Sequence, residues 1–219
     1  MSFFAITLKV IDFLTLLWYN GVMRVVYRKD IGIANRALKK GEILGVPTET
    51  VYGLAVRLDN DQAIRKLLTM KQRPVGSGKI LTLMLPSVDV IPKYAEVDMR
   101  KLNMARHYFP GELTIILPKR KDWHNPYYDN FDNIGIRIPD YAYMLELLKA
   151  SGPLFVTSAN PRGEAPCYSH KELRKRMPEV DAVIEGYSGG NLPSTVVDWT
   201  SDTPRVVRQG GLLIVRYDN

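Results

Sequence analysis

The feature that most constrains how this chain can fold is the polar tripeptide Thr48-Glu49-Thr50, which lies between two apolar runs. Residues 42–46 before it read as a short strand entering the core, and residues 51–56 after it are apolar again. Buried polar groups are costly unless they form hydrogen bonds. The tripeptide therefore predicts either a capped turn at the end of a strand or part of a binding site.

Two further polar segments also follow apolar elements. Residues 71–74 (KQRP) end an amphipathic helical pattern and place two cations before a glycine-rich loop. Residues 157–160 (TSAN) follow the apolar strand 153–156. In α/β proteins, ligands bind where the loops at the ends of such elements meet. Three polar loops of this kind predict one shared site.

Strand and helix patterns alternate along most of the chain, and its last part is rich in strands. This order predicts a single α/β domain over residues 23–219, built on a twisted, open, mixed sheet that is flanked by helices. The expected helices cover residues 30–41, 60–74, 98–108, 140–150 and 169–177, with caps at Asp30, at Asn60 or Asp61, and at Ser169. The expected strands cover residues 42–46, 80–85, 113–117, 134–138, 154–157, 182–184, 195–197, 206–207 and 212–215. The longest irregular stretch, residues 119–133 with Trp123, Tyr127 and Tyr128, is expected to be a lid or a binding loop.

Residues 1–22 form an N-terminal extension to this domain. The run 3–18 is mostly apolar, but Lys9 and Asp12 interrupt it, and it is short for a membrane span. It also lacks the basic start and the cleavage site of a signal peptide. We expect a start codon assigned too far upstream or a dispensable amphipathic segment, with a membrane-surface anchor as the sharper alternative. No membrane partner is expected.

The net charge limits the kinds of binding partner that we expect, and the cysteine content limits the expected cellular compartment. The net charge of +7 predicts an anionic partner, such as a nucleotide, a polyphosphate or a nucleic acid, although a basic surface alone is common in soluble proteins. The single cysteine, Cys167, excludes an intramolecular disulfide and fits a reducing cytoplasm. The three histidines are scattered without metal-ligand spacing, so no metal site built by the protein is expected.

Cationic side chains are the candidates for holding phosphate. Residues 76–80 (GSGKI) superficially resemble a P-loop, but Ile80 stands where Ser or Thr must hold magnesium. Lys71 and Arg73 are two residues apart at a helix end and can point into one cleft, where Arg binds phosphate in bidentate fashion and Lys acts as a point charge. Helix ends also favour cations for structural reasons. Arg208 is either a surface cation or a second phosphate ligand.

Hydroxyl, amide and guanidinium groups complete the candidate set. Ser158 and Asn160 either form a strand-to-turn exit or face a ligand. Arg137 alternates with the isoleucines of its strand, so it is either solvated or turned toward a carboxylate. No nucleophile–base pair is visible, and Glu49 is either a base or a loop carboxylate. This set suits a reaction that depends on positioning and charge neutralisation, such as adenylyl transfer from metal-bound ATP.

Taken in order, these segments resemble the YrdC-like family of threonylcarbamoyl-AMP synthases in its short, single-domain form. The similar segments are Pro47–Leu54, Lys71–Pro74, Phe109–Thr114, Gly135–Pro139, Thr157–Asn160, Pro193–Asp198 and Arg208–Gly210. The resemblance extends from about Met23 to the C-terminus. One departure lies after the Ser-Ala-Asn element, where the family often has x-Ser-Gly and this chain has residues 161–163 (PRG). Arg162 there either adds a phosphate contact or lies on the surface.

The resemblance implies a defined reaction. The family condenses L-threonine, bicarbonate or CO2, and ATP into threonylcarbamoyl-AMP and pyrophosphate, as a nucleotidyltransferase, with Mg2+ that arrives on ATP. A separate threonylcarbamoyl-transferase complex then modifies the adenosine beside the anticodon of ANN-decoding tRNAs. A twisted α/β sheet with a basic concave cleft and a cytoplasmic location are implied as well.

The resemblance also implies a role for each matching residue. Lys71 and Arg73 would be catalytic, binding the ATP phosphates and neutralising the leaving pyrophosphate. Threonine would be bound by Thr48, Arg137 and Ser194. The nucleotide would be bound by Lys71, Arg73, Ser158, Asn160 and Arg208, with Ser158 and Asn160 also near the carbamate.

Other functions remain open at this stage. A non-catalytic module of the same fold could bind double-stranded RNA or tRNA through phosphate contacts, although the cations are dispersed and no aromatic–basic stacking platform is visible. A carbamoyl-adenylate enzyme of hydrogenase maturation would carry further domains with zinc-finger-like cysteines, and this chain has none. A third alternative is an α/β domain with capped turns and no functional site, but its seven segments would then have to match those of the YrdC-like family, in the same order, by chance.

Overall fold

The computed structural model describes residues 23–73 and 80–214. The expectations for residues 1–22, for Pro74, for the glycine-rich residues 76–79 and for Val215 fall outside these ranges. No helix within the described ranges is long and apolar enough to cross a membrane.

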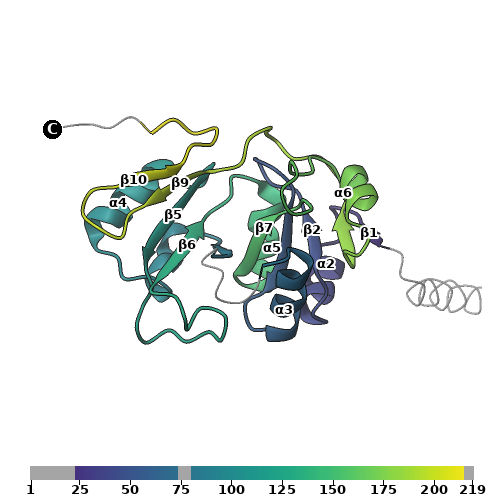
Figure 1. Cartoon of the computed structure of the whole chain (residues 1–219), viewed down its shortest axis with the longest axis horizontal. Coiled ribbons are helices and arrows are strands. Elements are labelled where there is room, and N and C mark those ends of the chain that lie inside the picture. Colours follow the sequence, from purple (N-terminus) through teal and green to yellow (C-terminus); the bar gives the residue numbers. More distant parts are fainter. Residues whose placement is uncertain (1–22, 74–79, 215–219) are drawn as a thin grey trace, which may run out of the picture.

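A single mixed sheet organises the described chain (Figure 1). Its order is β1-β8-β2-β3-β7-β4-β6-β5-β9-β10. The pairs β1–β8, β2–β8, β4–β6 and β5–β9 are parallel, and the remaining pairs are antiparallel. The strands are β1 Arg24–Val26, β2 Leu44–Val46, β3 Gly53–Arg57, β4 Thr82–Met84, β5 Leu113–Pro118, β6 Asn133–Arg137, β7 Leu154–Ser158, β8 Ala182–Ile184, β9 Thr195–Asp198 and β10 Arg205–Arg208. The predicted mixed α/β fold is confirmed.

The helices begin close to the predicted capping residues. They are α2 Ile31–Lys39, α3 Asp61–Met70, the 3-10 helix η2 Val88–Lys93, α4 Met99–Tyr108, α5 Ala142–Ser151 and α6 His170–Arg176. The Asn60 side chain accepts a hydrogen bond from the Ala63 amide (2.9 Å), and Ser169 caps α6 in the same way. These bonds satisfy amides that the first turn of a helix leaves free. Asp30 precedes α2 without a side-chain capping bond.

The alternation of side chains along the strands produces a core on each face of the sheet. In β7, Phe155 packs into one buried cluster, whereas Leu154 and Val156 pack into the other. The second cluster contains the apolar faces of α2 and α5, which contact each other. Burying each such side chain contributes roughly 1.5–3 kcal/mol. Figure 1 shows α4 beside β9 and β10 at one end of the sheet, and α6 beside β1 at the other.

Part of the loop of residues 119–133 belongs to the core, because Asn125, Tyr127 and Tyr128 are buried while the rest of the loop is exposed or half-buried. The expectation of a lid is wrong for this buried part. Tyr127 and Tyr128 are buried, and their hydroxyl groups accept from the amide of Leu81 and donate to its carbonyl, respectively. Trp123 packs edge-on against Tyr94. The aromatic residues therefore hold this loop against β4.

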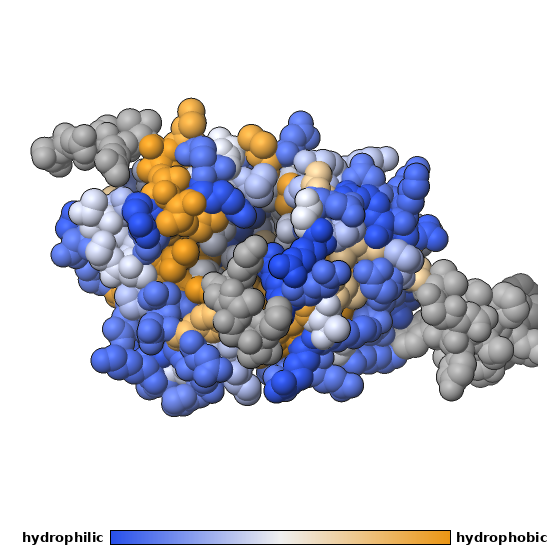
Figure 2. Space-filling view, in the orientation of Figure 1, coloured by the Kyte–Doolittle hydropathy of each residue, from blue (hydrophilic) through white to orange (hydrophobic). Residues whose placement is uncertain are grey.

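The expected strand at residues 212–215 is also absent over its described part, residues 212–214. The Leu212 carbonyl accepts hydrogen bonds from the side chains of Thr195 (2.7 Å) and Gln209 (2.8 Å). Side chains thus fix this segment in place of a strand ladder. Figure 2 shows a hydrophobic band over this end of the sheet, where the exposed large apolar residues are Leu192, Val206, Val207 and Leu213.

Candidate active site

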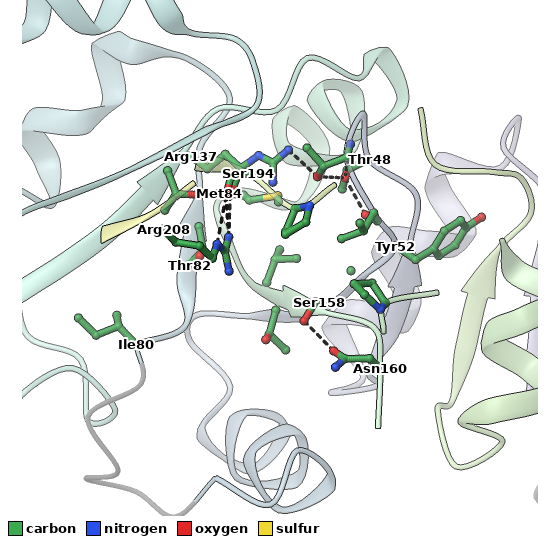
Figure 3. Close-up of a pocket in the computed structure, with 18 of the residues that line it drawn as sticks. Thr48, Tyr52, Ile80, Thr82, Met84, Arg137, Ser158, Asn160, Ser194 and Arg208 are labelled. Atoms are coloured by element: carbon green, nitrogen blue, oxygen red, sulfur yellow. Dashed lines mark hydrogen bonds between the residues drawn. The ribbon is translucent and has the colours of Figure 1, made fainter. Parts of the chain in front are cut away.

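A cavity of about 440 Å³ brings the three polar loops together. Met84 and Val156 belong both to its wall and to the second core cluster, so the cavity lies at the border of that cluster. Arg137, Ser194 and Arg208 lie together on one side, and Ser158 and Asn160 lie across from them (Figure 3). The polar and charged residues of its wall are Thr48, Thr50, Tyr52, Arg73, Thr82, Thr114, Arg137, Thr157, Ser158, Asn160, Glu164, Ser194 and Arg208.

The turn that carries Thr48 and Thr50 is both capped and part of the cavity. Thr48 Oγ1 donates to the carbonyl of Val51 (2.7 Å) and accepts from the Thr50 amide (3.2 Å). The Thr48 carbonyl accepts from the amide of Gly189 (2.8 Å). Both threonines are buried and line the cavity. The two sequence interpretations of this segment are therefore compatible.

Arg137 is turned toward a carboxylate, as one of its two predicted alternatives required. It ends β6 and is only 6% exposed. Its Nη2 donates to Glu49 Oε1 (2.7 Å) and to Thr50 Oγ1 (2.8 Å). The guanidinium thereby connects the 48–50 turn to the sheet.

Ser194 and Arg208 form a second network, which includes a residue that the sequence analysis missed. Arg208 Nη2 donates to the carbonyl of Ser194 (2.8 Å) and to its Oγ (3.2 Å). Thr114 Oγ1 lies 2.8 Å from Ser194 Oγ. Thr114 is the one polar residue in an apolar strand, and that signal could have identified it. Burial, followed by the nearby charge of Arg137, lowers the pKa of Arg208.

Arg73 reaches the cavity from the end of α3. Its Nη1 donates to Thr157 Oγ1 (3.2 Å), so Thr157 is a second residue without a predicted role. Burial is the main cause that lowers the pKa of Arg73. A partly desolvated guanidinium of this kind interacts strongly with an anion.

Lys71 does not line the cavity, although it was expected to act beside Arg73. Its side chain is buried behind the strand exit, where Nζ donates to the Ser158 carbonyl (2.9 Å), to Asn160 Oδ1 (2.7 Å) and to the Asn160 carbonyl. Gln72 between the two cations has a φ of +48°, a left-handed conformation that is uncommon for residues other than glycine. Both side chains reach the exit of β7, Lys71 at Ser158 and Asn160 and Arg73 at Thr157, but only Arg73 lines the cavity. Burial, followed by the charge of Arg73, lowers the pKa of Lys71 to about 8.

The exit of β7 is preorganised by this ammonium group. Ser158 Oγ donates to Asn160 Oδ1 (2.7 Å), and Asn160 Nδ2 donates to the Glu164 carbonyl (2.7 Å). Arg162 is exposed and donates to the carbonyl of Gln72 (3.1 Å), which corresponds to the surface alternative for this residue. Ser158 and Asn160 thus meet the cavity in fixed positions.

Comparison with known proteins identifies the family. The family model Sua5/YciO/YrdC, described as telomere recombination, matches residues 36–210. A threonylcarbamoyl-AMP synthase of Vibrio campbellii is 34% identical over 183 residues, which cover 80% of this chain and 96% of that protein. The chain belongs to the Sua5/YciO/YrdC family. The resemblance found in the sequence is thereby confirmed.

This Sua5/YciO/YrdC member is similar in structure to a YciO protein and to a Sua5 protein. E. coli YciO is 29% identical with a TM-score of 0.77, and the match covers 86% of this chain and 96% of that one. P. abyssi Sua5 complexed with L-threonine is 26% identical with a TM-score of 0.77 over 87% of this chain. The chain spans 58% of that Sua5 chain.

A glycine beside Ser194 gives a first test of the site's packing. A Cβ at Gly210 would lie 2.1 Å from the Pro193 carbonyl oxygen and 2.5 Å from the backbone of Ser194 and Thr195. Backbone cannot yield as a side-chain end can, so Gly210→Ala is expected to destabilise the fold by about 1–3 kcal/mol and to displace Ser194. Thermal unfolding checks the first effect. Gly32→Ala, in the open first turn of α2, is the matched control and should not destabilise. Equal stability of the two variants would contradict this packing.

Proposed function

We propose that this chain is an L-threonylcarbamoyladenylate synthase, a nucleotidyltransferase that joins L-threonine, CO2 or bicarbonate, and ATP. The observation that carries the proposal is the convergence of Arg73, Arg137 and Arg208 with hydroxyl and amide groups in one cavity. Membership of a family that includes threonylcarbamoyl-AMP synthases, and a Sua5 complexed with L-threonine, supports the same assignment.

The threonine end of the site would be formed by Thr48, Arg137 and Ser194. Arg137 lines the cavity, and its guanidinium suits the threonine carboxylate because a charge-assisted hydrogen bond can form between them. The hydroxyl groups of Thr48 and Ser194 lie on the same wall and can exchange hydrogen bonds with the substrate's polar groups.

The nucleotide end would be formed by Arg73, Arg208, Ser158 and Asn160. Arg73 and Arg208 supply positive charge for the phosphates, and Ser158 and Asn160 supply polar groups across the cavity. Lys71 would act through Ser158 and Asn160, because all three of its donors are used by these two residues. It is thus proposed as a positioning residue, while Arg73 is proposed as the cation that meets the pyrophosphate.

The chemistry follows from holding these groups together. The threonine amine attacks the carbon of CO2 and loses a proton, which gives a carbamate. A carbamate oxygen then attacks the α-phosphorus of ATP, and the bond from that phosphorus to the pyrophosphate breaks. Negative charge grows on the leaving pyrophosphate, and Arg73 and Arg208 would stabilise it. Fixed positions of both reactants replace a rare three-body encounter.

Magnesium would enter the cavity bound to the ATP phosphates. Its contribution there is to neutralise phosphate charge. Among the described residues, no group of three or more His, Cys, Asp and Glu side chains could hold a metal ion. The wall does present the hydroxyl groups of threonine and serine residues, which are hard oxygen donors that Mg2+ accepts.

The product is a mixed anhydride of a carbamic and a phosphoric acid, so a group-transfer enzyme must consume it. We propose a threonylcarbamoyl-transferase complex acting on ANN-decoding tRNA in the cytoplasm as that consumer. The competing function, a module that only binds double-stranded RNA or tRNA, predicts salt-sensitive RNA affinity without turnover.

Omitting one substrate at a time tests the proposal. Pyrophosphate release from ATP and Mg2+ is expected to require both L-threonine and bicarbonate. L-Serine, which lacks the methyl group, serves as the matched substrate control and should be used less efficiently. Release that proceeds without threonine, or RNA binding without any release, would refute the synthase assignment.

A further inference from the structure

We propose that Glu49 is a positioning residue that orients Arg137 for the carboxylate of the substrate, without touching the substrate itself. The proposal rests on the proposed function, because it takes Arg137 as the group that receives the threonine carboxylate. Glu49 does not line the cavity, whereas its partner Arg137 does. Its influence on a ligand must therefore pass through the guanidinium.

The guanidinium of Arg137 is held at one end by the protein. Nη2 is shared between Glu49 Oε1 at 2.7 Å and Thr50 Oγ1 at 2.8 Å, and the side chains of Arg137 and Glu49 are only 7% and 12% exposed. Nη1 makes no hydrogen bond to any described residue. Unlike Nε, it is not fully buried. One end of the guanidinium is thus fixed by protein, and Nη1 is left for a ligand.

The ion pair between Glu49 and Arg137 forms only one of the two hydrogen bonds that such a pair can make. A carboxylate and a guanidinium can form two parallel hydrogen bonds. Here Glu49 Oε2 and Arg137 Nε are both buried and lack partners within the described residues. Each unsatisfied buried group is costly, and a buried ion pair is weak support for stability in any case. The geometry therefore favours orientation of Arg137 over stabilisation of the fold.

The backbone of Glu49 is itself fixed by close packing against two glycines. A Cβ at Gly190 would lie 2.7 Å from the Glu49 carbonyl oxygen, and one at Gly189 would lie 3.1 Å from the Glu49 Cα. The two glycines allow their loop to pack directly on the turn, and Gly189 donates to the Thr48 carbonyl at 2.8 Å. Glu49 is thereby a firm anchor for the guanidinium.

The charge of Glu49 also acts on the two cations of this wall. Arg208 shares the cavity wall with Arg137 and is close enough for the charge of Arg137 to lower its pKa. The negative charge of Glu49 partly neutralises this pair of cations from behind. Without it, the repulsion between Arg137 and Arg208 would be unopposed, and Thr50 alone would hold Nη2.

The test compares Glu49→Ala and Glu49→Gln with the wild-type protein. Glu49→Ala is expected to raise the KM for L-threonine by about 10–100-fold, with the KM for ATP changed by less than about threefold. Glu49→Gln keeps an oxygen that can accept from Nη2, so its effect on the threonine KM should be several-fold smaller. Glu42→Gln is the matched control, because Glu42 pairs with Arg24 outside the cavity. It should leave both KM values unchanged.

Binding of L-threoninol distinguishes a role of Glu49 in orienting Arg137 from a merely structural role. Threoninol lacks the carboxylate, so its binding, measured by calorimetry, should be the same in the wild-type protein and in Glu49→Ala. Equal losses of threonine and threoninol affinity would overturn the proposal, as would an unchanged threonine KM in both Glu49 variants. If Glu49→Ala does not fold, Glu49→Gln tests the proposal, because it should raise the KM for threonine by a smaller factor and leave the KM for ATP unchanged. A wild-type protein that neither binds nor turns over threonine would instead refute the proposed function.

Discussion

Arg73→Ala is expected to lower kcat for threonine-dependent pyrophosphate release by about 10²–10³-fold, the usual loss when one preorganised charge-stabilising group is removed. Arg73 lines the cavity, and its hydrogen bond to Thr157 fixes the guanidinium there. The charge that develops on the leaving pyrophosphate is greatest in the transition state, so kcat should fall more than the ATP affinity. Steady-state kinetics separates the two effects.

Two comparisons sharpen this prediction. Arg73→Lys keeps the charge but loses the bidentate geometry, so it should recover only part of the activity. Arg162→Ala removes an exposed cation that follows the same strand exit, and it should leave kcat nearly unchanged. If Arg73→Ala retained full turnover with an unaltered melting temperature, Arg73 would not be the cation that meets the pyrophosphate.

Lys71→Met is expected to cause the largest combined loss, because it should reduce both stability and activity. The substitution keeps the length of the side chain but removes the three hydrogen bonds that Lys71 donates to the Ser158 carbonyl and to two oxygens of Asn160, of which Oδ1 keeps its bond from Ser158 Oγ. Loss of these charge-assisted hydrogen bonds should destabilise the protein by about 3 kcal/mol. Thermal unfolding without any ligand detects this loss, since a residue that only bound phosphate would not stabilise the free protein.

The pH dependence of Lys71 separates activity from stability. Its pKa is about 8 in the folded protein, because of burial and the charge of Arg73, and lies near 10.4 in an unfolded chain. Between these values the unfolded state binds more protons, so the contribution of Lys71 to stability rises with pH. The neutral amine, however, has two donors for three acceptors, so Ser158 and Asn160 lose a bond. We expect kcat to fall above about pH 8 while the melting temperature shows no parallel fall from this group. A flat kcat from pH 7 to 9.5 would contradict this role.

Sequence reasoning located the site through residues whose polarity contradicted their surroundings. The Thr48-Glu49-Thr50 turn between apolar runs and the single Arg in the β6 strand both proved to line or support the cavity. Such residues are informative because a fold tolerates buried polar groups only when they have partners. The capping residue Asn60 was equally readable, since its chemistry is local.

Features that depend on tertiary packing were not readable in this way. The different environments of Lys71, which is buried, and Arg73, which lines the cavity, depend on how the end of α3 packs against the exit of β7, and the composition of the segment does not specify this packing. The aromatic residues of the 119–133 loop could equally line a ligand site or fill a core, and only the position of β4 decides between them. The partners of Thr114 and Thr157, which are Ser194 and Arg73, are distant in sequence, so the sequence did not show which groups these threonines contact.

The central claim is that the cavity joins threonine, a one-carbon unit and adenylate, and one measurement tests it most directly. The protein is incubated with ATP, Mg2+, L-threonine and ¹³C-labelled bicarbonate, and the adenylates formed are analysed by mass spectrometry. The account predicts threonylcarbamoyl-AMP that carries the ¹³C label, in amounts equal to the pyrophosphate released, and its loss in Arg73→Ala. A threonyl-adenylate without the label, or no adenylate from a folded protein that still binds ATP, would contradict the account.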